Sequence, residues 1–153
     1  MIGVDWPDGS RWELRHLCLD LNGTLALDGV LLDGVAETLR LLARDLEIHL
    51  LTAGTHGGLV EVERQLGLRA VPIGRGPEKR DYVERLGAEH CVAVGNGRND
   101  AAMLELARLG VAVLGPEGLA AVTARAADIL VPDIVSGLTL LTHPLRIVAT
   151  LRP

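Results

Sequence analysis

The stretch Leu17-Cys18-Leu19-Asp20-Leu21-Asn22-Gly23-Thr24-Leu25 decides which fold and which chemistry we expect. A run of apolar residues ends in one carboxylate, Asp20, and the chain then breaks at Gly23 before a short polar turn. In an open α/β sheet, ligands bind beyond the carboxyl ends of the parallel strands. A carboxylate placed there can be a nucleophile, a metal ligand or both. Taken alone, Asp20 fits a turn or a helix cap equally well, so the choice depends on the rest of the chain.

The composition predicts one domain over residues 1–153 with an aliphatic core. Hydrophobic residues make up 48% of the chain, which has no Phe, one Tyr and two Trp. Such a core suits parallel strands that are buried on both faces. The formal net charge of −5 and the few aromatic side chains argue against nucleic acid or an anionic membrane surface as a partner.

The same composition predicts a cytoplasmic location. No apolar run reaches the ~18–20 residues of a membrane span, and the first residues do not form a signal peptide. Cys18 and Cys91 both lie in apolar, strand-like runs. We expect them to be buried thiols rather than a disulfide, as in a reducing compartment.

Strand and helix patterns alternate along most of the chain. Hairpins are expected over 2–15, around Pro7-Asp8-Gly9-Ser10, and over 25–32, around Asp28-Gly29, where the second would form a small flap. Strands are predicted at 16–21, 46–51, 68–73, 91–94, 111–114 and 128–131. Helices are predicted at 34–44, 57–66, 78–86, 100–109 and 116–125, with helical segments over 133–151 that break at Pro144. This order predicts an α/β fold with a doubly wound, Rossmann-like parallel sheet and helices on both faces.

Polar groups follow the predicted strands at one edge of this sheet, and a lysine joins them from a helix N-terminus. They are Asp20, Asn22, Thr52, Asn96, Asp100 and Lys79. A hydroxyl, a lysine, backbone amides and a helix dipole favour an anion such as phosphate. Carboxylate and amide oxygens favour a hard cation such as Mg²⁺. A phosphate beside an aspartate nucleophile needs the cation and the lysine to offset the repulsion.

In this order the residues resemble the four motifs of the haloacid dehalogenase-like (HAD) phosphotransferases. The series consists of Asp20-x-x-Gly-Thr-Leu, a strand-end Thr52, a helix-opening Lys79 and the loop Gly95-Asn96-Gly97-Arg98-Asn99-Asp100. The stretches 77–79 and 95–104 look most like the phosphorylation domain of P-type ATPases. Only 31 residues lie between Asp20 and Thr52, and the region from Thr52 to Lys79 is equally short. The resemblance is therefore to members without a cap domain.

The resemblance implies a Mg²⁺-dependent phosphohydrolase or phosphotransferase for a small phosphorylated substrate. Asp20 would become an aspartyl-phosphate, and Asn22, Thr52 and Lys79 would complete the catalytic set. The phosphate would be bound by Thr52, Ala53, Lys79 and Asn99, and Mg²⁺ by Asp20, Asn22 (through its backbone carbonyl), Asn96 and Asp100. Uncapped members act on exposed phosphates or close their sites by oligomerising, so a homo-oligomer is possible.

Two residues depart from the family pattern. Asn22 stands where family phosphatases carry an Asp that acts as general acid and base, a role typically worth ~10²–10⁴-fold in rate. Asn96 stands where the family usually has a metal-binding Asp. Slow hydrolysis is one expectation, and a catalytically impaired phosphate- or metabolite-binding regulatory module is the alternative.

The five histidines are not expected to bind a metal. His16, His49, His56, His90 and His143 show no metal-ligand spacing in the sequence, and each is expected to be structural or exposed. Only His56, just beyond Thr52, is a candidate to face the predicted pocket.

Overall fold

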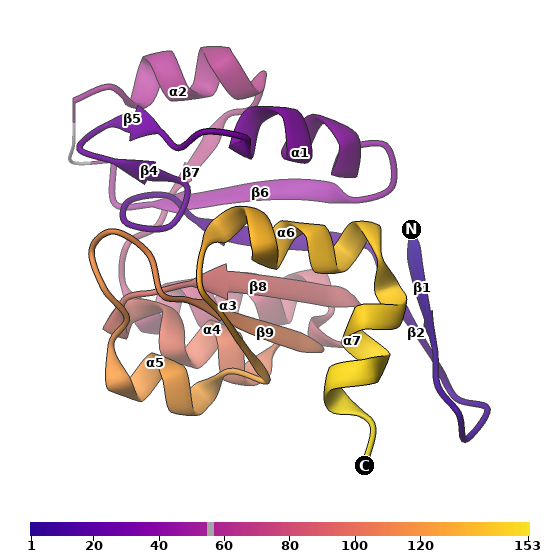
Figure 1. The fold of residues 1–153 in the computed structure, drawn as a ribbon. Coiled ribbons are helices and arrows are strands. Elements are labelled where there is room, and N and C mark those ends of the chain that lie inside the picture. Colours follow the sequence, from indigo (N-terminus) through magenta and orange to yellow (C-terminus); the bar gives the residue numbers. More distant parts are fainter. Residues whose placement is uncertain (55–56) are drawn as a thin grey trace.

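A computed structural model describes residues 1–54 and 57–153, and its centre is a sheet of six parallel strands (Figure 1). The strands run in the order β10-β9-β8-β3-β6-β7 across the sheet. Their bounds are β3 (His16–Asp20), β6 (Glu47–Thr52), β7 (Ala70–Pro72), β8 (Cys91–Gly95), β9 (Leu109–Val113) and β10 (Ile129–Val131). The predicted doubly wound parallel sheet is confirmed. Because β3 lies between β6 and β8, Asp20 leaves the sheet near its middle.

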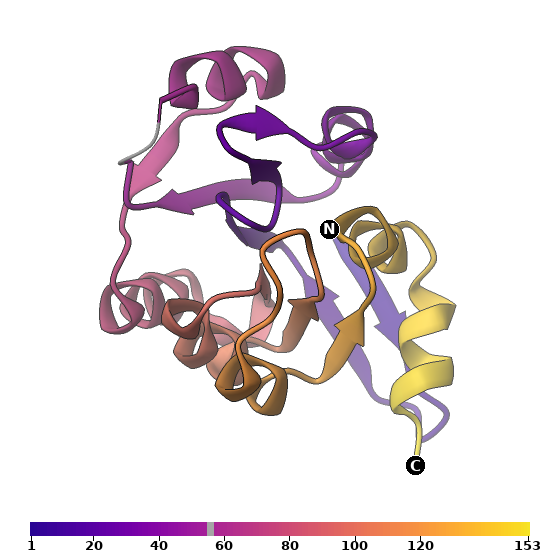
Figure 2. The same ribbon diagram turned by 60° about the vertical axis from the view of Figure 1, so that its left-hand side comes forward.

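Helices cover both faces of this sheet (Figures 1 and 2). Their bounds are α1 (Val35–Leu42), α2 (Leu59–Leu66), α3 (Gly76–Leu86), α4 (Ala101–Leu106), α5 (Ala121–Ala126), α6 (Ile134–Thr142) and α7 (Pro144–Leu151), with 3₁₀ turns η1 (Ala88–His90) and η2 (Arg98–Asp100). Within the described ranges, no single helix is long and apolar enough to cross a membrane. Only α6 and α7 taken together satisfy the length and composition, and they are bent by 104° relative to each other.

The sheet is apolar on both faces because successive side chains of each strand point to opposite sides. Leu17 and Leu19 of β3 belong to the core shared with α1 and α6. Cys18, between them, belongs to the core shared with α3 and α4, which also contains Cys91. Both cysteines are buried free thiols, as predicted. The run of apolar residues before Asp20 is thus explained by burial on two sides.

Both predicted hairpins form. In the first, β1 (Ile2–Asp5) pairs antiparallel with β2 (Arg11–Leu14), and the rings of Trp6 and Trp12 lie 4.6 Å apart between centroids. In the second, β4 (Ala26–Leu27) pairs with β5 (Val30–Leu31) around Asp28 and Gly29. These two turn residues have φ values of 51° and 79°. Two successive positive φ values explain why Asp-Gly connects these short strands.

Two predicted helices are wrong in their bounds. Helix 100–109 ends at Leu106, and Leu109 instead begins β9, because Ala107 adopts an extended backbone. The stretch from Met103 to Val113 is apolar apart from Glu105 and Arg108, so its pattern does not mark where the helix ends and the strand begins. Helix 116–125 is replaced by α5 alone, because residues 115–118 form a turn in which the Gly118 N–H bonds to Gly115 O and φ of Gly118 is +81°.

The central strands should carry much of the stability. Leu50 of β6 is fully buried, whereas Leu145 of α7 is 80% exposed, so the same substitution can be compared at both sites. We expect Leu50→Ala to lower the free energy of unfolding by about 2–5 kcal/mol, because it removes buried apolar volume. Leu145→Ala should change it by less than about 0.5 kcal/mol. Urea unfolding followed by circular dichroism measures both, and equal losses would contradict this account of the core.

Candidate active site

The carboxyl edge of the sheet brings the predicted strand-end residues together. Asp20 ends β3, Thr52 ends β6, and Asn96 directly follows β8. All three side chains are buried although they are polar, with exposed fractions of 8%, 2% and 7%. Buried polar groups need partners, so their contacts define what the site can do.

Lys79 is the centre of these contacts. It lies in the first turn of α3, is fully buried, and is the only lysine of the chain. Its Nζ donates to Asp20 Oδ1 and to Asp100 Oδ1, each at 2.8 Å. Burial acts to lower the pKa of Lys79, but the attraction of Asp100 and Asp20 and their hydrogen bonds outweigh it and leave the pKa raised. The lysine is therefore held as a buried cation rather than as a solvated charge on the helix surface.

Asp100 fixes both the lysine and the loop after β8. While Oδ1 accepts from Lys79, Oδ2 accepts from the backbone N–H groups of Asn96 and Gly97 at 3.0 and 2.9 Å. A side chain at Gly95 would lie 2.5 Å from the Asp100 carboxyl group, so only glycine allows this approach. Most of the acceptor capacity of Asp100 is thus taken up by protein donors. This makes it a positioning group for Lys79 in the described structure.

Thr24 joins the site, although the sequence motifs did not predict it as a site residue. Its hydroxyl is fully buried and lies 3.1 Å from Asp20 Oδ2 and 3.0 Å from Asn96 Oδ1. A hydroxyl has one proton to donate, so it can satisfy only one of these two oxygens at a time. The sequence contained one indication of this role, because Thr24 lies four residues after Asp20 in the stretch quoted above. The turn places it there because the N–H groups of Thr24, Leu25 and Ala26 all bond to Leu21 O.

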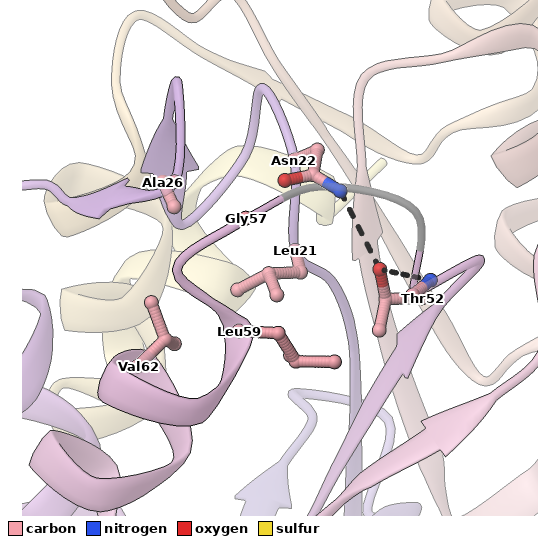
Figure 3. Close-up of a pocket in the computed structure, with 9 residues that line it drawn as sticks. Leu21, Asn22, Ala26, Thr52, Gly57, Leu59 and Val62 are labelled. Atoms are coloured by element: carbon pink, nitrogen blue, oxygen red, sulfur yellow. Dashed lines mark hydrogen bonds between the residues drawn. The ribbon is translucent and has the colours of Figure 1, made fainter.

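Asn22 lies on the other side of the site, facing Thr52 (Figure 3). Asn22 Nδ2 is 3.4 Å from Thr52 Oγ1, and the Gly54 N–H is 3.3 Å from the same oxygen. These groups border a small pocket between the end of β6, the start of α2 and the flap. It is lined by Leu21, Asn22, Ala26, Gly29, Thr52, Gly54, Gly57, Leu59 and Val62. The pocket thus has an apolar wall and a polar end at Asn22 and Thr52.

The two remaining predicted phosphate-binding residues lie at the exposed rim. Asn99 Nδ2 donates to Gly74 O at 2.7 Å. Ala53 is exposed and packs against Gly74 so closely that a Cβ there would lie 2.5 Å from that of Ala53. Ala53 and Asn99 therefore meet the same glycine from two loops. His56 lies outside the described residues.

The electrostatics of the site fit a divalent cation. Burial, and next to it the charge of Asp100, raise the pKa of Asp20 to about 6 despite the lowering effect of Lys79. Two carboxylates share one ammonium, so a further positive charge beside Asp20 would favour its ionised form. Asp20 Oδ2 and Asn96 Oδ1 are oxygens of the kind that Mg²⁺ prefers. Asp20 and Asn96 together carry less negative charge than two carboxylates would, because the Asn96 amide is neutral.

Relatives by sequence cover part of the chain. No protein-family model matches it. The uncharacterized protein MJ0073 of Methanocaldococcus jannaschii is 44% identical over 61 residues, which are 40% of this chain and 66% of that protein. The uncharacterized protein MJ0072 of the same organism is 49% identical over 39 residues, which are 26% of this chain and 89% of that protein. The chain belongs to the same family as MJ0072.

Solved structures match nearly the whole chain. The 3-deoxy-D-manno-octulosonate 8-phosphate phosphatase of Moraxella catarrhalis, in complex with magnesium, phosphate and KDO, has a TM-score of 0.67 at 16% identity, over 89% of this chain and 90% of that one. A Streptomyces avermitilis protein assigned as a HAD family hydrolase has a TM-score of 0.64 at 21% identity, over 84% and 90%. This chain has the HAD fold.

A third solved structure has the same fold. A phospho-aspartyl intermediate analogue of phosphoserine phosphatase has a TM-score of 0.65 at 14% identity, over 86% of this chain and 99% of that one. At these identities the likeness concerns the fold alone. The closer likeness to the P-type ATPase phosphorylation domain stays a prediction from the sequence.

Within this HAD fold, the burial of the only lysine can be tested chemically. We expect an amine-reactive reagent to modify the α-amino group of the native protein and to leave Lys79 unmodified, because Lys79 is fully buried and protonated. In denaturant, Lys79 should react. Peptide mass spectrometry after a short pulse of reagent measures both. Rapid labelling of Lys79 in the native protein would contradict the buried bridge.

Proposed function

We propose that this chain is a Mg²⁺-dependent phosphohydrolase or phosphotransferase that works through an aspartyl-phosphate at Asp20. The observation that carries the proposal is the buried bridge in which Lys79 holds Asp20 and Asp100 at 2.8 Å each. A lysine in contact with a carboxylate at the carboxyl edge of a parallel sheet suits a nucleophile that attacks an anionic group.

The proposed reaction has two steps. In the first, an Asp20 carboxylate oxygen attacks the phosphorus of the substrate, a new O–P bond forms, and the bond to the leaving oxygen breaks. The leaving oxygen takes a proton from water. In the second, water attacks the same phosphorus, the Asp20–phosphoryl bond breaks, and inorganic phosphate and a free carboxylate result. Lys79 lowers the repulsion between the two anions in both steps, and Thr52 offers a hydroxyl to the phosphoryl oxygens.

The divalent cation belongs to this proposal as well. Asp20 and Asn96 would hold it with the backbone carbonyl of Asn22, while Asp100 keeps Lys79 in place. When bound, Mg²⁺ supplies positive charge that neutralises the phosphoryl oxygens. Support comes from the pKa of Asp20, which burial and Asp100 raise to about 6 in the absence of such a charge. A small phosphorylated metabolite is the proposed substrate class, which is the class named for the octulosonate 8-phosphate phosphatase of the same fold.

Asn22 suggests that the second step is slow. An amide can neither protonate the leaving group nor take a proton from the attacking water. Its side chain instead lies 3.4 Å from Thr52 Oγ1, so it orders the hydroxyl that would face the phosphate.

The nucleophile is tested by Asp20→Asn, which keeps the shape of the side chain and removes its charge. We expect Mg²⁺-dependent turnover of a generic aryl phosphate to fall to background. Asp45→Asn is the matched control, because Asp45 is exposed and precedes β6, at the opposite end of that strand from Thr52. Full activity in Asp20→Asn would exclude the covalent mechanism.

The role of Asn22 is tested by Asn22→Asp, which supplies the missing acid. We expect hydrolysis to rise by up to ~10²–10⁴-fold, the usual contribution of a general acid–base group. The gain must vanish in the double variant Asp20→Asn/Asn22→Asp. An unchanged or lower rate in folded Asn22→Asp would count against the proposed cause of slow hydrolysis.

A phosphate- or metabolite-binding regulatory module is the second candidate function. The hydrogen bonds of the Asn96 side chain favour this candidate: its Oδ1 accepts from the Thr24 hydroxyl, and its Nδ2 donates to Gly118 O at 3.1 Å. That amide is built into the loops rather than kept free for an ion. Incubation with acetyl phosphate and Mg²⁺, followed by intact mass, separates the two candidates. A phosphoryl adduct absent from Asp20→Asn supports the enzyme, and repeated absence of adduct and turnover supports the module.

A further inference from the structure

The opposite edge of the sheet carries a second cluster of ionisable side chains. His16 begins β3 and pairs in register with Glu47, the first residue of β6. His49 follows two residues later, on the same face of β6 as Glu47. The sequence shows no metal-ligand spacing among the histidines, because His16 and His49 are 33 positions apart. The parallel register nevertheless brings the two rings together.

Ligand atoms of three residues converge in this cluster. His16 Nδ1 lies 3.2 Å from His49 Nε2 and 3.4 Å from Glu47 Oε2, and His49 Nε2 lies 3.9 Å from Glu47 Oε1. Zinc binds histidine nitrogen at about 2.0–2.1 Å with tetrahedral geometry, which places neighbouring ligand atoms roughly 3.3–3.4 Å apart. With one ligand atom taken from each residue, the three atoms lie within 4.8 Å of one another. The two histidine nitrogens are already at the separation of a loaded site, and a bound ion would draw the exposed Glu47 side chain closer to them.

A second observation concerns the other ring nitrogen of His49. His49 Nδ1 lies 3.0 Å from the Tyr82 hydroxyl, contributed by α3. When Nδ1 is protonated and donates to that oxygen, the lone pair of Nε2 points toward His16 and Glu47. Metal-bound histidines almost always have such an outer partner, which fixes the tautomer. Burial also lowers the pKa of His49, which favours the neutral ring that a metal requires.

Access to the cluster differs from one ligand to the next. The side chain of His49 is 7% exposed, that of His16 is 18% exposed, and that of Glu47 is 68% exposed. The histidines thus form a fixed inner pair, while Glu47 reaches them from the surface. An ion can enter from solvent, and water can complete its coordination.

We propose that His16, His49 and Glu47 form a binding site for a divalent transition ion of the Zn²⁺ class, separate from the Asp20 site. Two imidazoles and one carboxylate suit zinc and its neighbours rather than Mg²⁺, which prefers oxygen ligands. The ion joins the amino ends of β3 and β6, the strands whose other ends carry Asp20 and Thr52. The proposal does not depend on the phosphatase activity.

The test uses Co²⁺ as a visible probe for the Zn²⁺ site. Metal-free protein is titrated with Co²⁺ in excess Mg²⁺, and the d–d absorption of four- or five-coordinate Co²⁺ is followed. We expect one Co²⁺ per chain, displaced by Zn²⁺, and the same binding in Asp20→Asn. His16→Gln and Glu47→Gln should weaken binding by at least about tenfold, and Tyr82→Phe by about 10–100-fold through the outer contact.

His143→Gln is the matched control, because His143 is exposed and lies outside the cluster. It should bind Co²⁺ as the wild type does. Circular dichroism verifies that each variant is folded. If His16→Gln does not fold, Glu47→Gln still tests the proposal, because Glu47 is exposed. Absence of the absorption bands in excess Mg²⁺ would overturn the proposal, and so would full binding by folded His16→Gln and Glu47→Gln.

Discussion

One buried ammonium between two carboxylates organises the carboxyl edge of the sheet. Lys79 of α3 contacts Asp20 of β3 and Asp100 of η2, so a single side chain ties together three segments that are distant in sequence. Burying charges is costly, and such a bridge is tolerated only when every partner is present. Loss of Lys79 would leave two buried carboxylates without a counter-charge, whereas loss of one aspartate would leave a one-to-one ion pair. The same constraint explains the glycine at position 95, the close packing of the loop and the absence of solvent around the lysine.

The sequence was sufficient for the fold and for most of the residues that meet at the carboxyl edge of the sheet. Apolar runs ending in polar residues predicted the parallel sheet, and the motif order predicted that Asp20, Thr52, Lys79, Asn96 and Asp100 would share one edge. Local patterns did not reveal how deeply Lys79 is buried, because a lysine in a first helical turn is usually solvated. They also missed Thr24 as a hydrogen-bonding partner, since its contact with Asn96 spans 72 residues. The wrong bounds of two helices have a local cause: one segment is largely apolar through both the helix and the following strand, and the other contains a glycine turn.

The fold and the chemistry are set by different parts of the chain. Proteins with 14–21% identity share this architecture, so the pattern of buried residues is enough to specify it. Function depends instead on a few polar side chains at the carboxyl ends of the strands. Here two of these groups are amides, Asn22 and Asn96, and each is hydrogen-bonded to a neighbouring loop or strand. The arrangement lowers the negative charge of the site while it keeps the geometry of the bridge.

The first hairpin gives the molecule an unusual optical property. Both tryptophans of the chain, Trp6 and Trp12, lie in that hairpin with their rings in contact. The one tyrosine, Tyr82, belongs to α3 and lies beside His49 of β6. Intrinsic tryptophan fluorescence therefore senses the surroundings of the hairpin, whereas tyrosine emission senses the amino edge of the sheet. The tryptophans and the tyrosine therefore report on two neighbouring parts of the amino side of the sheet without any engineered label.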